Sequence, residues 1–293
     1  MPGPGGVKAL FLEDAGLGQA MVGHGLFLGL VQPLGFFLEF LEVRGPDHRL
    51  QPDACSRFID HVQADHLPHA VIIDCTADPG IAGQYTGWLE RGIHIITPNK
   101  RAHSGPMEDY SRLKRLSHVA NTHFLYEATV GAGLPIIQTL KDLVETGDEI
   151  ESISGIFSGT LAYLFNVFDG TRPFSEIVRD ACARGYTEPD PRDDLSGMDV
   201  ARKAIILARE AGLGLELGDL QVENLVPEAL TDTSVEEFLD RLIDFDEPLA
   251  LRFESASAKD EVLRYVADVN LKKGAACVRL ETYSVDHPFA NIN

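Results

Sequence analysis

The chain has 293 residues, 44% hydrophobic and 24% charged, which is enough for one large or two ordinary domains with a substantial core. Its formal net charge of -20 repels nucleic acid and anionic membrane surfaces, so neither is expected as a partner. Its four cysteines are widely spaced and fit neither a zinc site nor a disulfide framework, which favours the reducing cytoplasm.

The most apolar stretch, residues 21–43, does not have the pattern of a membrane helix. A membrane span needs about 20 predominantly apolar residues. Here His24, Gln32, Pro33 and two glutamates interrupt the run. The start of the chain carries one lysine followed by acidic residues, unlike the basic start of a signal peptide. A cytoplasmic protein is therefore expected.

The first half of the chain alternates short apolar runs with helical patterns. This rhythm predicts a right-handed βαβαβ unit on a parallel sheet, with ligands bound beyond the carboxyl ends of the strands. The predicted strands lie within residues 69–78, 93–100 and 123–133, and the predicted helices within 80–92 and 107–121.

The second half has a different pattern, typical of an α+β domain. We place the domain boundary so that residues 1–132 form the nucleotide-binding domain and residues 133–293 form the second domain. Amphipathic patterns predict helices at 134–148, 173–185 and 197–212, a strand-turn-helix at 149–168, and an antiparallel hairpin at 262–285.

The acidic segment "GYTEPDPRDDLSGMDVARK", residues 185–203, is the strongest candidate for a site. Asp199 and Lys203 are four residues apart on a predicted helix and therefore share a face. Glu188 lies on a loop that Pro189 and Pro191 stiffen. Two carboxylates and one ammonium suit a small zwitterion. From composition alone, an ordinary Asp–Lys pair on a solvated helix is the more common case.

Two further features leave alternatives open. Lys100 ends the run "ITPNK", where a parallel sheet presents ligand loops, so an anion contact and a solvated lysine are both reasonable. Glu127 begins the glycine-rich turn "EATVGAG", whose carboxylate and carbonyls could bind a hard cation. The pattern alone favours a plain tight turn.

Together, "DCTAD", "TPNKRA", "YEATVGAGLP", "GIFSGTLAYLFN" and the long acidic segment resemble homoserine dehydrogenase over about residues 70–290. The similarity is greatest to the dehydrogenase half of bifunctional aspartokinase–homoserine dehydrogenases. The resemblance implies a Rossmann-like domain and the reversible NADP- or NAD-dependent reduction of L-aspartate 4-semialdehyde to L-homoserine, a step of threonine and methionine biosynthesis. It also implies a homodimer formed through the second domain, and a fused or upstream aspartokinase domain is an open possibility.

The resemblance assigns roles to single residues. Lys203 becomes the catalytic lysine and proton donor, and Lys100 lies near both cofactor and substrate. Thr76 becomes a cofactor contact. The implied substrate-binding residues are Glu188, Asp194, Asp199, Gly159 and Thr160. The implied sodium-binding turn consists of Glu127, Val130, Ala132 and Leu134, three of them through backbone carbonyls.

The amino-terminal region departs from the family pattern. Gly3, Gly5 and Gly6 resemble a dinucleotide-binding glycine loop, but the strand that should precede it is missing, so an incomplete sheet is expected. Residues 11–68 are expected to match the family poorly, and the chain is expected to be truncated at both ends. The choice between NADP and NAD stays open. An incomplete non-catalytic fragment, or a reductase for another amino-acid aldehyde, are the alternatives.

Overall fold

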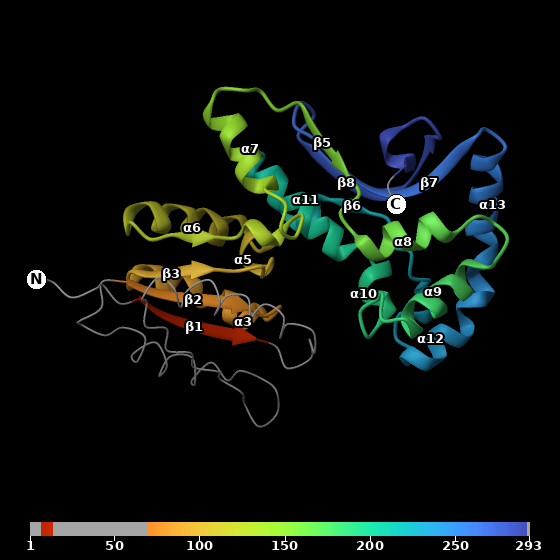
Figure 1. Cartoon of the computed structure of the whole chain (residues 1–293), viewed down its shortest axis with the longest axis horizontal. Helices are drawn as coiled ribbons and strands as arrows, with labels where there is room; N and C mark the ends of the chain where they lie inside the picture. Colours follow the sequence, from red (N-terminus) through yellow and green to blue (C-terminus); the bar gives the residue numbers. More distant parts are fainter. Residues whose placement is uncertain (1–6, 14–68, 292–293) are drawn as a thin grey trace, which may run out of the picture. The chain divides into compact units, whose positions relative to one another are not determined.

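The computed structural model of the chain describes residues 7–13 and 69–291. The chain divides into two compact units, Met1–Ile136 and Ile137–Asn293 (Figure 1). Strands and helices alternate in the described part of the first unit, whereas the second contains a mixed sheet covered by helices. The described elements are therefore α/β in the first unit and α+β in the second.

The first unit is built on a parallel sheet whose four described strands follow one another in chain order. Its central strands are buried because they are rich in isoleucine: Ile72, Ile93 and Ile95 have no exposed surface. The strands are β1 (Val7–Glu13), β2 (His69–Cys75), β3 (Ile93–Ile96) and β4 (Phe124–Leu125). The helices are α3 (Pro79–Ala82), α4 (Tyr85–Glu90), α5 (Arg101–Ser104) and α6 (Met107–Val119), and a 3-10 turn, η2 (Glu127–Thr129), follows β4.

The predicted βαβαβ order is observed, with two differences. The single helix predicted over 80–92 is two short helices, separated at Gly83 and Gln84. The sheet also has a strand that the sequence does not predict, β1, which pairs in parallel with β2 from Val7 opposite His69 to Glu13 opposite Cys75. Only the four residues between Lys8 and Glu13 form an uninterrupted apolar run, which is a short signal for a strand.

The glycines proposed for a dinucleotide loop, Gly3, Gly5 and Gly6, lie outside the described residues. In the dinucleotide-binding fingerprint the glycine turn follows a strand. Here the first described strand, β1, comes after the glycines. Their contact with a cofactor stays a prediction.

The second unit has a four-stranded sheet in the order β5-β7-β8-β6. Its strands are β5 (Ser152–Gly155), β6 (Gln221–Val222), β7 (Glu261–Asn270) and β8 (Ala275–Ser284). The predicted hairpin is confirmed as the antiparallel pair β7–β8. The helices are α7 (Ile136–Glu145), α8 (Gly159–Val167), α9 (Phe174–Ala183), α10 (Pro191–Leu195), α11 (Met198–Glu210), α12 (Val235–Arg241) and α13 (Asp246–Ser257). Short 3-10 turns are η3 (Leu217–Asp219), η4 (Glu228–Leu230), η5 (Leu242–Phe245) and η6 (Pro288–Asn291).

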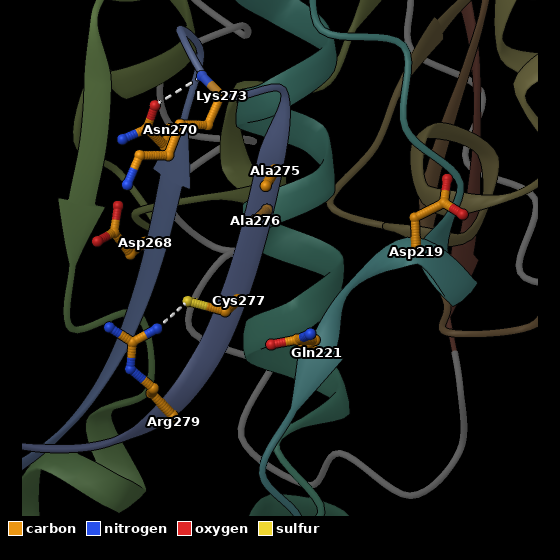
Figure 2. A pocket seen from close by; sticks show the side chains of 9 residues that line it. All are labelled: Asp219, Gln221, Asp268, Asn270, Lys273, Ala275, Ala276, Cys277 and Arg279. Carbon is orange, nitrogen blue, oxygen red and sulfur yellow. Dashed lines mark hydrogen bonds between the residues drawn. The ribbon is translucent and has the colours of Figure 1, made fainter.

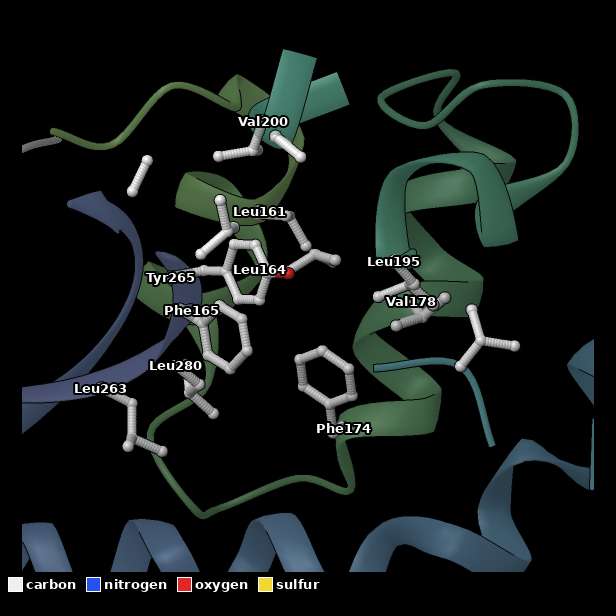
Figure 3. Packing of buried hydrophobic residues seen from close by; sticks show 14 of the residues in the cluster. Leu161, Leu164, Phe165, Phe174, Val178, Leu195, Val200, Leu263, Tyr265 and Leu280 are labelled. Carbon is white, nitrogen blue, oxygen red and sulfur yellow. The ribbon is translucent and has the colours of Figure 1, made fainter. Parts of the chain in front are cut away.

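The core of the second unit lies between one face of this sheet and the helices. Tyr265 and Leu280 of the hairpin pack in one cluster with Leu161 and Phe165 of α8 (Figure 3). Helix α11 is deeply buried, because its residues 204–208 have at most 1% exposure. It contributes Val200, Ala201, Ala204, Ile205 and Ala208 to this core. Each such buried aliphatic side chain larger than alanine contributes about 1.5–3 kcal/mol to stability. The core therefore fixes α11, which carries the candidate catalytic lysine.

Candidate active site

The first two turns of α11 carry a charged pair, Asp199 and Lys203. The side chains of Asp199 and Lys203 lie one turn apart, as predicted, and Lys203 Nζ is 2.7 Å from Asp199 Oδ2. The same Nζ donates to the carbonyl oxygen of Phe157 at 2.7 Å. Lys203 is 17% exposed and Asp199 is 47% exposed, so the pair opens toward solvent on the carboxylate side.

These two contacts hold the ammonium group in one position. An ammonium has three N–H donors. In the described part of the chain, one donor goes to Phe157 and one to Asp199, which leaves the third for a ligand oxygen. A lysine tethered in this way can present a positive charge and a proton at a fixed point.

Gly197 determines where α11 begins. Its φ of 71° is left-handed, a conformation that glycine adopts without strain. A Cβ added here would lie 2.0 Å from the hydroxyl oxygen of Tyr265, which donates to the carbonyl of Glu223 at 2.5 Å. Only glycine therefore fits between α10 and α11, and this turn places Asp199 in the first turn of the helix.

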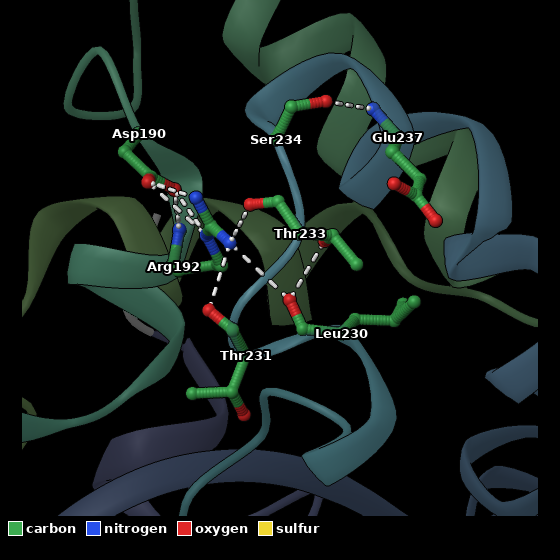
Figure 4. A network of polar contacts seen from close by, with 7 residues as sticks. All are labelled: Asp190, Arg192, Leu230, Thr231, Thr233, Ser234 and Glu237. Carbon is green, nitrogen blue, oxygen red and sulfur yellow. Dashed lines mark hydrogen bonds and ion pairs between the residues drawn. The ribbon is translucent and has the colours of Figure 1, made fainter.

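The loop before α10 is anchored by Arg192 (Figure 4). Its guanidinium pairs with Asp190 at 2.6 Å and donates to the carbonyls of Leu230, Thr231 and Thr233 at 3.2, 3.0 and 2.7 Å. The hydrogen bonds from Arg192 hold the pKa of the Asp190 carboxyl below its usual range. Asp190 also caps α10 by accepting the Arg192 backbone N–H. The segment that carries Glu188 therefore ends at Asp190 and Arg192, whose hydrogen bonds hold it in place.

Asp194 and Thr160 lie beside Glu188. The Glu188 backbone N–H donates to Asp194 Oδ2 at 2.8 Å, and the Thr160 hydroxyl donates to the Tyr186 carbonyl at 2.9 Å. Burial raises the pKa of Asp194, although hydrogen bonds from Glu188 and Thr160 oppose the rise. Repulsion from Asp199 also raises it, so this group adjoins the Lys203 pair. At least one carboxylate oxygen of Asp194 therefore accepts a hydrogen bond from the loop that carries Glu188.

Five of the predicted active-site residues therefore lie on α10, α11 and the start of α8: Asp194, Asp199, Lys203, Gly159 and Thr160. Glu188 lies on the loop before α10. Gly159 is the first residue of α8, and Ser158 caps this helix by accepting the Leu161 backbone N–H. The sequence reveals Asp199, Lys203 and Glu188 but not the carbonyl of Phe157, because a backbone acceptor leaves no signal in residue types. Arg192 is visible in the motif, but its distant partners are not.

In the first unit, Thr76 and Lys100 follow neighbouring parallel strands. Thr76 is 3% exposed, and its hydroxyl accepts the Asp78 backbone N–H at 3.2 Å. Lys100 precedes α5, and its carbonyl accepts the N–H and the hydroxyl of Ser104, both at 2.9 Å. Both residues lie at the carboxyl ends of β2 and β3, the edge where parallel sheets bind ligands.

A buried polar cluster, which the sequence does not single out, connects these two loops. Asp74 has no exposed surface and accepts the Thr76 backbone N–H at 2.8 Å and the Asn99 amide at 3.1 Å. It also contacts the Tyr85 hydroxyl, which lies 2.9 Å from the Thr97 hydroxyl. Burial raises the pKa of Asp74. The only signal in the sequence is that each apolar strand run ends in polar residues.

The predicted cation turn combines a carboxylate with an unusual backbone path. Glu127 begins η2, and Gly131 and Ala132 have left-handed φ values of 78° and 52°. The Leu134 carbonyl accepts the Ile136 N–H at 2.9 Å. Carboxylate and carbonyl oxygens are the ligands that a hard cation prefers, and a cation at this turn stays a prediction. Among the described residues no group of three or more His, Cys, Asp or Glu side chains could hold a metal ion, which does not test a site built from carbonyls.

Two further findings concern the helices and cysteines of the described residues. None of the helices in the described ranges is long and apolar enough to cross a membrane. The three described cysteines, Cys75, Cys182 and Cys277, are all free thiols.

Two family models match the chain. The model described as homoserine dehydrogenase matches residues 135–293, and the model described as homoserine dehydrogenase, NAD binding domain, matches residues 42–127. The second match begins inside the stretch 11–68, so the expectation that this whole stretch matches poorly is wrong. A glycine pattern rests on a few positions and is a weak sign of family membership, whereas a family model compares every position of the matched range.

Individual relatives agree with these matches. The bifunctional aspartokinase/homoserine dehydrogenase 1 of Zea mays is 54% identical over 245 residues, 83% of this chain and 27% of the relative. The homoserine dehydrogenase of Schizosaccharomyces pombe is 46% identical over 241 residues, 80% of this chain and 64% of the relative. The chain thus spans about a quarter of the plant relative and less than two thirds of the fungal one.

A solved structure supports the fold. A Candida auris protein of unknown function superimposes with a TM-score of 0.82 and 34% sequence identity. The match covers 98% of this chain and 87% of that chain.

Proposed function

The chain belongs to the homoserine dehydrogenase family, and on this premise we propose that it catalyses the reversible reduction of L-aspartate 4-semialdehyde to L-homoserine. The observation that carries the proposal is the fixed ammonium of Lys203, held 2.7 Å from both Phe157 O and Asp199 Oδ2 beside the Glu188 loop. Carboxylates next to one tethered lysine match a substrate that has both an ammonium group and a reacting carbonyl.

We assign a separate role in this reaction to each candidate residue of the second unit. Glu188 and Asp199 bind the substrate α-ammonium group, and Asp199 also orients Lys203. When hydride reaches the aldehyde carbon, negative charge grows on the oxygen, and Lys203 stabilises this oxygen and gives it a proton. Asp194 and Thr160 keep the Glu188 loop in place, and Gly159 leaves room for the substrate at the start of α8.

The hydride is supplied by a nicotinamide cofactor when one is bound. The first unit matches an NAD-binding domain over residues 42–127, which supports a site for it. We assign Thr76 and Lys100 to this site, because both follow the carboxyl ends of neighbouring parallel strands. The family resemblance also implies a role for Lys100 near the substrate. We keep NADP as the first choice and NAD as the second.

The turn at Glu127 is proposed to hold a sodium ion through that carboxylate and the carbonyls of Val130, Ala132 and Leu134. The two consecutive left-handed residues, Gly131 and Ala132, support this assignment. The turn would then be a rigid structural element close to the unit boundary. Sodium removal is expected to lower thermal stability more than it changes turnover.

We further propose a homodimer formed through the second unit. Residues of β7 and β8 alternate, so Ala267 and Val278 enter the core while Asp268 and Arg279 face the other side. On that side lies a hollow of about 290 Å³ lined by both acidic and basic side chains (Figure 2). A face of mixed charge is suited to self-association. Arg279→Glu is expected to shift the mass measured by light scattering from dimer to monomer.

The names of several relatives include an aspartokinase, so a fused or upstream aspartokinase domain is proposed as a partner. A cytoplasmic location also stays a proposal. The plant relatives are named as chloroplastic, which is a statement about those proteins.

The activity test uses the purified chain with L-homoserine and either NADP⁺ or NAD⁺, followed by the absorbance of the reduced nicotinamide. Turnover of homoserine, and little turnover of its analogue without the α-amino group, is the expected result. Equal turnover of both would favour a general aldehyde reductase. A folded protein that binds no nicotinamide would favour the non-catalytic fragment.

A pair of variants tests the substrate site. Asp199→Asn is expected to raise the KM for homoserine by about tenfold or more, because a charge-assisted bond to the substrate ammonium is lost. Asp193→Asn, at an exposed carboxylate on the preceding helix α10, is the matched control and is expected to leave KM unchanged. Equal effects would show a general charge effect and contradict the assignment.

A further inference from the structure

The buried cluster at the ends of β2 and β3 contains more oxygen contacts than its hydroxyl groups can supply with protons. Asp74 Oδ2 contacts the Tyr85 hydroxyl, which lies 2.9 Å from the Thr97 hydroxyl. The Thr97 hydroxyl in turn lies 2.9 Å from the backbone carbonyl of Asp74. The three contacts therefore form a closed ring that starts and ends on Asp74.

Each oxygen–oxygen contact needs one proton, and Tyr85 and Thr97 together carry only two. The Asp74 backbone carbonyl has none, so Thr97 must donate to it, and Tyr85 must then donate to Thr97. The remaining contact, between Tyr85 and the Asp74 carboxyl, has a proton only if the carboxyl itself carries one. The two hydroxyl protons can fill only two of the three contacts, so the third proton belongs to the carboxyl.

The remaining partners agree with this assignment. The Thr97 hydroxyl accepts the Asn99 backbone N–H at 2.8 Å, which together with Tyr85 fills its two lone pairs. The second Asp74 oxygen, Oδ1, accepts the Thr76 backbone N–H at 2.8 Å and needs no proton. The carboxyl has no exposed surface, and burial in this position favours the neutral form of an acid.

We infer that Asp74 is a neutral carboxylic acid whose proton closes a hydrogen-bonded ring with Tyr85 and Thr97. This ring is a positioning device for the two loops that follow β2 and β3. Asp74 holds the backbone of Thr76, and Asn99 donates to both the Asp74 carboxyl and the Asp78 carbonyl at 3.1 Å. Asn99 Oδ1 also accepts the Arg101 backbone N–H at 3.0 Å. The residue between Asn99 and Arg101 is Lys100, so the ring fixes the backbone on both sides of it.

The positioning role rests on the proposed function, because it assumes that Thr76 and Lys100 contact the nicotinamide cofactor. The protonation state does not rest on it. The two parts are therefore tested by separate measurements, so that failure of one is distinguishable from failure of the other.

The protonation state is tested by infrared difference spectroscopy of the wild-type chain against Asp74→Asn at neutral pH. The wild type is expected to show a carboxylic-acid carbonyl band that the variant lacks and that shifts in deuterated water. A carboxylate band lost in its place would overturn the inference, whatever the protein catalyses.

The positioning role is tested with Tyr85→Phe, which opens the ring but keeps the aromatic packing. The dissociation constant of NADPH, followed by its fluorescence, is expected to rise by about five- to tenfold, since a buried hydrogen-bonding group loses its partner. Trp88→Phe is the matched control: Trp88 is on the same helix, 5.6 Å from the Tyr85 ring, and belongs to no part of the ring of hydrogen bonds. It is expected to change stability but to leave NADPH binding within about twofold.

Asp74→Asn and Asp74→Ala provide a second comparison if Tyr85→Phe folds poorly. An amide N–H can replace the acid proton toward Tyr85 but no longer accepts the Asn99 amide, so Asn is expected to keep more of the NADPH affinity than Ala. Equal affinity in both variants, or an equal loss of affinity in Tyr85→Phe and Trp88→Phe, would overturn the positioning role. A wild type that binds NADPH but does not oxidise homoserine would refute the proposed reaction and leave this inference standing.

Discussion

Gly197→Ala tests how the fold places the substrate carboxylates. Gly197 has a left-handed φ of 71°, and an alanine Cβ would lie 2.0 Å from the Tyr265 hydroxyl. The left-handed conformation costs an L-residue roughly 1–2 kcal/mol. Displacing the Tyr265 hydroxyl from the Glu223 carbonyl costs about 1 kcal/mol more. The expected loss of unfolding free energy is therefore about 2–3 kcal/mol.

Thermal unfolding followed by circular dichroism measures this loss, and it is expected to lower Tm by about 4–12 °C. The matched control is Gly212→Ala at the other end of α11, where φ is 90° but nothing lies within 4 Å of the added Cβ. This control is expected to lose only the conformational part, about 1–2 kcal/mol. Adding Tyr265→Phe to Gly197→Ala removes the clashing oxygen and should recover part of the difference. Equal losses in the two glycine variants, with no recovery, would refute the steric argument.

Two other changes have definite expected outcomes. Arg192→Lys should destabilise the second unit by about 1–3 kcal/mol, because a lysine cannot pair with Asp190 and reach three carbonyls at once. Chemical denaturation measures this loss. Arg184→Lys, at an exposed arginine, is the control and should change the unfolding free energy little. His94→Asn should flatten the acid side of the stability profile of the first unit. Burial and the neighbouring His123 and His69 lower the pKa of His94 below 6.5, so the folded state binds the proton more weakly than the unfolded chain. The stability that neutral His94 contributes is present above about pH 6.5 and is lost as the pH falls through the folded pKa. An unchanged pH profile of stability in the variant would contradict this role of His94.

The sequence predicts the parts of the fold that depend on local pattern. Isoleucine-rich runs identify β2 and β3, and the apolar periodicity around Lys203 identifies α11 within one or two residues of its ends. It does not predict β1, because the apolar run between Lys8 and Glu13 is only four residues long and the strand is recognised only by its pairing with β2. Pairing between residues about sixty positions apart leaves no local signal.

The sequence likewise predicts the local contact of the candidate site but not its long-range contacts. The four-residue spacing of Asp199 and Lys203 brings their charges together on one helix face, and the structure confirms the contact. The contact between Lys203 and the Phe157 carbonyl crosses 46 positions, and the contacts of Arg192 cross up to 41. The Asp74 ring joins residues 11 to 23 positions apart. Such contacts depend on tertiary packing, so residue types alone do not reveal them.

The central claim is that Lys203 gives the proton in the dehydrogenase reaction. The most direct test is steady-state turnover of Lys203→Ala with aspartate semialdehyde and NADPH, alongside the NADPH dissociation constant of the same variant. Turnover should fall by at least about a hundredfold, as expected for loss of a positioned acid, while NADPH binding and Tm stay close to wild type. A variant that folds, binds NADPH and turns over at the wild-type rate would contradict the claim.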